Sequence, residues 1–89
     1  MMYSVQRLEE KKLAVVLVGS RDINEPRATV LIRHIEEVLD LPVMLVCRDN
    51  ENFTGVRAKA HFDPYPAVYS LLGSRDIDWM PLPGAFGSN

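Results

Sequence analysis

The residues whose types and spacing best suit ligand binding lie in the segment VGSRDINEP, residues 18–26. The segment follows an apolar run and precedes a helical pattern, so it predicts a turn from a strand into a helix. Backbone N–H groups at such a turn can hold an anion, helped by the dipole of the helix. Gly19, Ser20 and Arg21 are therefore candidate phosphate-binding residues, and a small nucleotide- or phosphate-binding domain is one functional hypothesis.

This turn resembles the first glycine-containing turn of the Rossmann-like nucleotide-sensing domains of the SLOG type, in which an apolar strand runs into a Gly-Ser-Arg motif. The resemblance covers residues 13–27 and implies a phosphate site at the turn. No second glycine-rich loop follows a later strand, and a single glycine lacks the spacing of a dinucleotide fingerprint. The alternative is a structural turn, in which Gly19 makes the bend, Asp22 caps the helix and Arg21 is solvated or paired with a carboxylate.

The pentapeptide GSRDI occurs again at residues 73–77. The first copy leads from a strand into a helix and the second from a helix toward a strand, so the flanking patterns do not repeat. Gly, Ser and Asp are all favoured in turns, and we interpret the repeat as coincidence. An old internal duplication is the alternative.

Groups suited to catalysis or metal binding are few. His34 is predicted on the polar side of a helix and His61 at the end of the polar face of a strand, and neither has a closely spaced His or Cys companion. Cys47, the chain's one cysteine, lies in an apolar run and is expected to behave as a small hydrophobic residue. We therefore predict no catalytic residues, no metal and no cofactor, which favours a function other than that of an enzyme.

Charge and hydropathy restrict the kinds of partner and the cellular compartment that we expect for this protein. Ten basic against twelve acidic residues give a formal net charge of -2, which does not favour nucleic acid. Arg57, Lys59 and His61 alternate along one strand face but carry no aromatic residue between them, so a nucleic-acid accessory role is the weakest hypothesis. The longest apolar run, residues 13–18, is too short for a signal peptide or membrane span, and one cysteine suits a reducing compartment. We expect a cytoplasmic protein without membrane contact.

Large aromatic and sulfur-containing side chains gather in the last quarter of the chain. Trp, Tyr and Met are enriched at interfaces, and an 89-residue chain buries a modest share of its surface alone. A protein-interaction or homodimerising module is therefore the leading hypothesis. The alternative is that these residues close one end of the core. The candidate interface residues are Tyr65, Tyr69, Trp79, Met80 and Phe86.

Periodicity predicts the elements that position these groups. A first strand near Tyr3 and Val5 and a central strand over residues 13–18 form a hairpin, a helix spans residues 28–39 with Asp22 or Asn24 as its cap, and a parallel strand follows at residues 43–47. An alternating strand over residues 56–62, a short helix opened by Asp63 and an edge strand at residues 77–80 complete the pattern.

Together these elements predict an α+β fold of the order β-β-α-β-β-α-(β), a small two-layer sandwich with a mixed sheet of four to five strands. Periodicity leaves open whether the long and the short helix share one face. The expected domain spans residues 1–83, followed by a flexible tail at residues 84–89. Tyr65, Val68, Tyr69 and Leu72 form the expected apolar stripe of the short helix.

Overall fold

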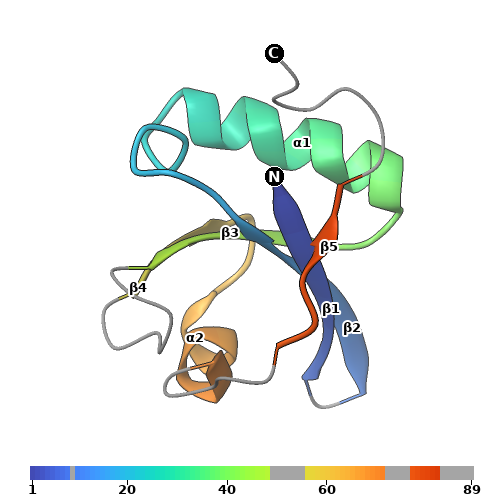
Figure 1. Ribbon diagram of the computed structural model, residues 1–89. Helices are drawn as coiled ribbons and strands as arrows, with labels where there is room; N and C mark the ends of the chain where they lie inside the picture. The colour runs from blue at the N-terminus through green and yellow to red at the C-terminus, as the bar shows by residue number, and fades with distance from the viewer. Residues whose placement is uncertain (9, 49–55, 72–76, 83–89) are drawn as a thin grey trace.

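The computed structural model of the chain describes residues 1–8, 10–48, 56–71 and 77–82. The predicted α+β class and element order are confirmed (Figure 1). Gly73, Phe86 and the expected tail at residues 84–89 lie outside the described residues. The elements are β1 (Met2–Leu8), β2 (Lys11–Leu17), α1 (Arg27–Leu39), β3 (Val43–Arg48), β4 (Val56–Ala60), α2 (Tyr65–Leu71) and β5 (Met80–Pro81).

The strands form one mixed sheet in the order β4-β3-β2-β1-β5. The hairpin of β1 and β2 is antiparallel, β2 and β3 are parallel with α1 as the crossover between them, and β3 and β4 are antiparallel. Each of these pairings was predicted from the sequence. The short strand β5 pairs with the outer side of β1, and its Pro81 fits an edge position because proline has no N–H to donate to a ladder.

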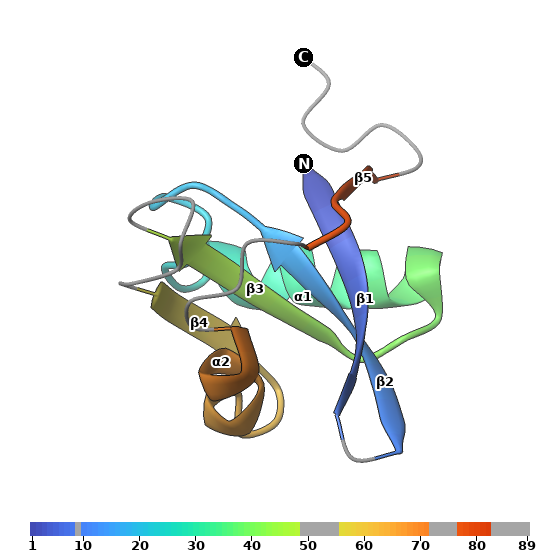
Figure 2. The same ribbon diagram turned by 60° about the horizontal axis from the view of Figure 1, so that its bottom comes forward.

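The two helices cover opposite faces of the sheet, as Figures 1 and 2 show. On the α1 face, Ala14 and Val16 of β2 pack with the buried side of α1, and on the α2 face Leu13 and Val15 pack with α2. Since successive side chains of a strand point to opposite faces, one continuous apolar run supplies both cores. The helix on the second face adds a layer that the expected two-layer sandwich does not have.

The long helix follows its predicted pattern. Ala28, Ile32 and Ile35 are its buried residues. It ends at Asp40, which adopts a left-handed conformation with φ 55° and donates its N–H to the carbonyl oxygen of Glu36 at 2.9 Å. Glu36 also accepts, through Oε2, the N–H of Val43 at 3.2 Å, so one helical residue helps set where β3 begins.

The short helix is rotated relative to its predicted stripe. Asp63 caps it as expected, because its Oδ1 accepts the N–H of Tyr65 at 3.1 Å. The residues it buries, however, are Ala67, Val68 and Leu71. The small side chain of Ala67 lets the helix approach the sheet closely, whereas a tyrosine in that position would hold it away. The prediction that Tyr65 and Tyr69 face the core is therefore wrong.

The described helices have 13 and 7 residues. Neither is long and apolar enough to cross a membrane.

Candidate functional site

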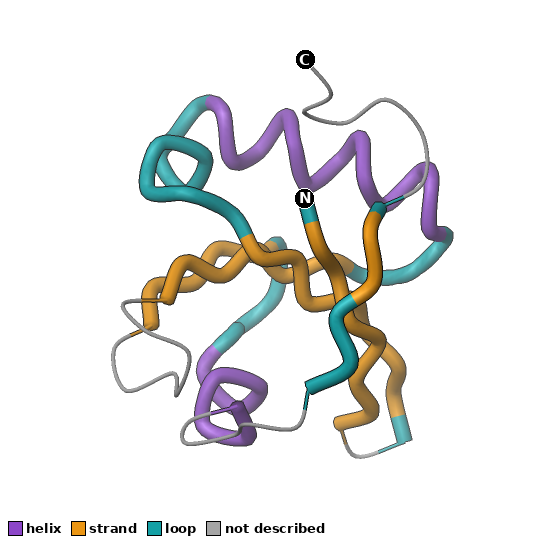
Figure 3. The backbone as a smooth tube through the Cα atoms, viewed as in Figure 1, coloured by secondary structure: helices purple, strands orange, loops and turns teal. Residues whose placement is uncertain are grey.

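The loop between β2 and α1 (Figure 3) carries the proposed phosphate residues. Hydrogen bonds within this loop close it. The N–H of Asp22 donates to the carbonyl oxygen of Gly19 at 3.1 Å, and the amide of Asn24 donates to the carbonyl oxygen of Ser20 at 3.2 Å. Asp22 Oδ1 is buried and lies 2.5 Å from Nε of Arg27, as an ion pair rather than a well-aligned hydrogen bond. Gly19, Ser20 and Arg21 are all exposed on this loop.

The N-terminus of α1 is occupied by a carboxylate of the chain itself. Glu25 accepts the backbone N–H of Thr29 at 2.9 Å through Oε1, and the Thr29 hydroxyl donates to Oε2. The expected caps were Asp22 and Asn24, and neither side chain caps the helix: Asp22 pairs with Arg27, and Asn24 offers its backbone oxygen to Ala28. The sequence signal for Glu25 was its spacing to Thr29, which matches one helical turn.

This arrangement removes one support for the phosphate hypothesis. An anion placed at the first turn of α1 would compete with the carboxylate of Glu25 for the N–H of Thr29. The predicted residues Gly19, Ser20 and Arg21 lie before this turn, where the carbonyl oxygens of Gly19 and Ser20 accept the N–H of Asp22 and the amide of Asn24. Phosphate binding at these three residues stays a prediction that rests on the sequence alone.

The contact between Glu25 and Thr29 makes a testable electrostatic prediction. The hydrogen bond from the Thr29 side chain lowers the pKa of Glu25, the Thr29 N–H and the nearby charges of Lys59 and His61 act in the same direction, and desolvation opposes them. Because the pKa in the folded state lies below that in the unfolded state, the contact stabilises the fold above the usual carboxyl pKa. That contribution is lost as the pH falls through the lowered pKa.

We expect Thr29→Val to raise the pKa of Glu25 toward its ordinary value, measured by NMR titration of the Glu25 carboxyl carbon. Val30→Ala is the matched control, since Val30 is the neighbouring residue and is exposed. An identical titration curve in wild type and Thr29→Val would contradict the assignment of this hydrogen bond.

A row of basic side chains runs along β4. Arg57 and Lys59 pair in register with Cys47 and Leu45, which belong to the α1 side of the core, so both basic residues lie on the α1 face. Arg57 donates to Sγ of Cys47 at 3.8 Å. His61 follows in the same row, with its Nδ1 3.7 Å from Oε1 of Glu36. All three basic residues are exposed, as the alternation of the sequence predicted.

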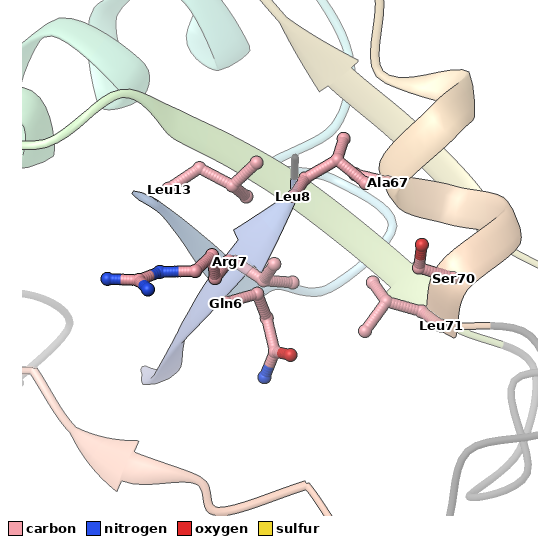
Figure 4. Close-up of a pocket in the computed structure, with 8 residues that line it drawn as sticks. Gln6, Arg7, Leu8, Leu13, Ala67, Ser70 and Leu71 are labelled. Atoms are coloured by element: carbon pink, nitrogen blue, oxygen red, sulfur yellow. The ribbon is translucent and has the colours of Figure 1, made fainter. Parts of the chain in front are cut away.

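The two tyrosines of α2 lie side by side in solvent. Tyr65 is 62% exposed and Tyr69 is 69% exposed, and their ring centroids are 6.5 Å apart. The opposite side of α2 faces β1 and β2: Figure 4 shows Ala67 and Leu71 toward Leu13. The tyrosines are therefore on the side of α2 that faces away from β1 and β2.

The other candidate interface residues lie elsewhere. Trp79 is half-buried against the apolar cluster on the α2 face, with the guanidinium carbon of Arg48 5.7 Å from its ring centroid. Met80, 42% exposed, belongs to the edge strand β5 and pairs with Tyr3. Of the predicted interface residues that the structure describes, Tyr65 and Tyr69 lie together. Trp79 instead packs half-buried against the apolar cluster on the α2 face, the position expected if it helps to close one end of the core.

Two hollows adjoin α2, and neither has the features of a specific small-molecule site. The cavity in Figure 4 has a volume of about 30 Å³, room for no more than a few water molecules. The larger hollow, about 320 Å³, is open and mainly apolar, and its one acidic residue, Asp63, already caps α2. Specific ligand sites combine apolar walls with several convergent polar groups. The lining of this hollow is Leu8, Lys11, Lys12, Leu13, Pro42, Phe62, Asp63 and Pro66.

Among the described residues, no group of three or more His, Cys, Asp or Glu side chains is placed to hold a metal ion. Within the described part of the chain, His61 and Glu36 contact each other, and Glu36 accepts the N–H of Val43, but no nucleophilic side chain joins the pair. Comparison with known proteins found no matching family model, no matching curated sequence and no matching solved structure.

Proposed function

We propose that this chain is a protein-interaction module and that it binds its partner through the β4–α2 flank, which we define as Arg57, Lys59, Tyr65 and Tyr69. The observation that carries the proposal is the exposed pair Tyr65 and Tyr69, held at 6.5 Å on a short helix. Tyrosine is enriched among residues that dominate binding energy, because a rigid ring buries a large area at a small entropic cost.

The rest of the flank suits recognition as well. Arg57 and Lys59 stand on the neighbouring edge strand and are exposed, so charge and aromatic surface lie on adjoining elements. Trp79 is the more buried aromatic residue and packs on the core, so its main contribution is to stability. The anchors of the proposed interface are accordingly the two tyrosines.

The charges of β4 favour a different chain over a second copy at this edge. Antiparallel pairing of two β4 strands with their α1 faces on the same side would place Arg57 opposite Lys59, or one of these residues opposite itself or His61. Like charges directly opposite one another destabilise a strand pair. A homodimer, where one forms, would therefore use another surface, such as the tyrosines alone.

Selection from a random peptide library displayed on phage tests this function. We expect peptides that bind wild type to lose at least tenfold in affinity for Tyr65→Ser/Tyr69→Ser, because the anchors are removed while the buried side of α2 is kept. Val30→Ser/Val38→Ser is the matched control, since both valines are exposed on α1. Selected peptides that bind the tyrosine variant and wild type equally, or a selection without binders, would refute the proposal.

A further inference from the structure

We infer that the β4–α2 flank takes up an extended segment of the partner as an added strand beside β4, and that this segment alternates acidic with apolar residues. The inference rests on the proposed function and specifies the kind of partner. Three features support it: the backbone edge of β4, the basic row on one face and the tyrosines on the other.

The backbone edge comes first. Among the residues that the structure describes, β4 is the outermost strand of the sheet and pairs with β3 on one side only. In an antiparallel ladder, alternate residues direct their N–H and C=O groups away from the partner strand. The five residues of β4 therefore present unpaired backbone groups along the outer edge, on which an extended peptide can form main-chain hydrogen bonds. At the opposite edge of the sheet, β5 has two residues, one of them Pro81, and pairs with Met2 and Tyr3 of β1.

The α1 face of this edge determines the charge of the added strand. Glu36 is engaged with the N–H of Val43 and with His61, and Glu25 accepts the N–H of Thr29 and also interacts electrostatically with Lys59. Arg57 contacts Sγ of Cys47, which is a weak acceptor. Arg57 and Lys59 thus present positive charge beside the free edge, and carboxylates at alternate positions of an added strand would lie across from them.

The α2 face of this edge determines which residues suit the other positions of the added strand, those between the acidic residues. Val56, Ala58 and Ala60 point to this face and are half-buried, and their small or branched side chains leave room for an apolar neighbour. Tyr65 and Tyr69 are exposed on α2, which packs against β4 on this face. Because side chains of a strand alternate between faces, a segment with acidic residues toward Arg57 and Lys59 directs its remaining residues toward the tyrosines. Apolar residues there would cover the exposed rings.

The test uses synthetic ten-residue peptides that alternate Glu with Val or Lys with Val, with binding measured by fluorescence anisotropy. We expect the Glu-Val peptide to bind wild type at least tenfold more tightly than the Lys-Val peptide and than a peptide of equal composition with its Glu and Val residues in two blocks. Methylation of alternate backbone nitrogens should weaken binding at least tenfold, because it removes donors needed for strand pairing.

Variants separate the charge effect from the fold. Arg57→Glu/Lys59→Glu should reverse the preference, so that the Lys-Val peptide binds more tightly. Lys11→Glu/Lys12→Glu changes the net charge by the same amount in the β1–β2 hairpin and should leave the preference as in wild type. Circular dichroism of each variant checks that it is folded.

Several results would overturn the inference. They are equal binding of the blocked, methylated and alternating peptides, an unchanged preference in Arg57→Glu/Lys59→Glu, and no binding of either alternating peptide. The last result would assign Arg57 and Lys59 the role of keeping the edge from pairing. If peptides from the random library still depend on Tyr65 and Tyr69 while alternation has no effect, the interaction function stands and strand addition is wrong.

Discussion

Ile35→Ala is expected to lower the free energy of unfolding by about 3 kcal/mol, within the range measured for deletion of a buried aliphatic side chain. Ile35 is fully buried at the centre of the cluster between α1 and the sheet. Its loss would leave a cavity against strands whose side chains are buried on both faces, so neighbouring groups have little freedom to collapse into it. Urea denaturation, followed by far-UV circular dichroism and by fluorescence of Trp79, the chain's one tryptophan, measures the effect.

Trp79 fluorescence reports on the side of the sheet opposite to the substitution, whereas far-UV circular dichroism reports on the whole backbone. Trp79 packs against the cluster on the α2 face, whereas Ile35 belongs to the α1 face, and the strands β2 and β3 are shared by both. We therefore expect both transitions to shift together, as in cooperative unfolding. Val30→Ala, at a position 66% exposed on the same helix, should change the stability by less than about 0.5 kcal/mol. A cost below about 1 kcal/mol for Ile35→Ala would contradict the packing described for α1.

The second large effect is expected on the other face, where Leu71→Ala should cost about 2 to 3 kcal/mol. Leu71 is 3% exposed and is one of three residues that α2 buries against the sheet. A helix of seven residues is not stable alone in water, so its order depends on this contact. The variant should therefore bind peptides selected on the β4–α2 flank more weakly, because α2 positions Tyr65 and Tyr69.

Tyr69→Ala should weaken peptide binding without a large loss of stability. Tyr69 is 69% exposed, so its removal should change the stability by about 0.5 kcal/mol or less while it weakens peptide binding. Urea denaturation and anisotropy on the same samples measure both quantities. If Leu71→Ala retained full stability, or if Tyr69→Ala were as destabilised as Leu71→Ala, the orientation of α2 described here would be wrong.

Local sequence determined the elements and most of the sheet. The apolar run in β2, the helical stripe of α1 and the apolar run in β3 predicted a parallel crossover, and the register of β2 with β3 confirms it. The alternation in β4 also predicted which of its side chains share a face. These features could be predicted because periods of two and of 3.6 residues are properties of a single segment, independent of what packs against it.

The flank itself could not be predicted from the sequence. Its basic row was visible in the alternation of Arg57 with Lys59, but nothing local placed α2 and its tyrosines against the strand that carries this row. In α2, both the side with the tyrosines and the side with Ala67 and Leu71 have helical spacing. The side with Ala67 and Leu71 packs on the sheet because its smaller side chains allow the helix to approach the sheet more closely. The contact of Glu25 with Thr29 was missed for a related reason, since Asp22, Asn24 and Glu25 are all capable acceptors and the path of the loop decided which of them reaches the first turn of α1.

The sequence by itself therefore determined which residues form strands and helices and which side chains share a face of each element. Only the tertiary structure decided that α1 and α2 cover opposite faces of the sheet, that Tyr65 and Tyr69 remain in solvent, and that the helix which carries them packs against β4. The physical reason is that periodicity is set within one segment by backbone geometry, whereas the choice of face depends on how segments distant in the chain fit together.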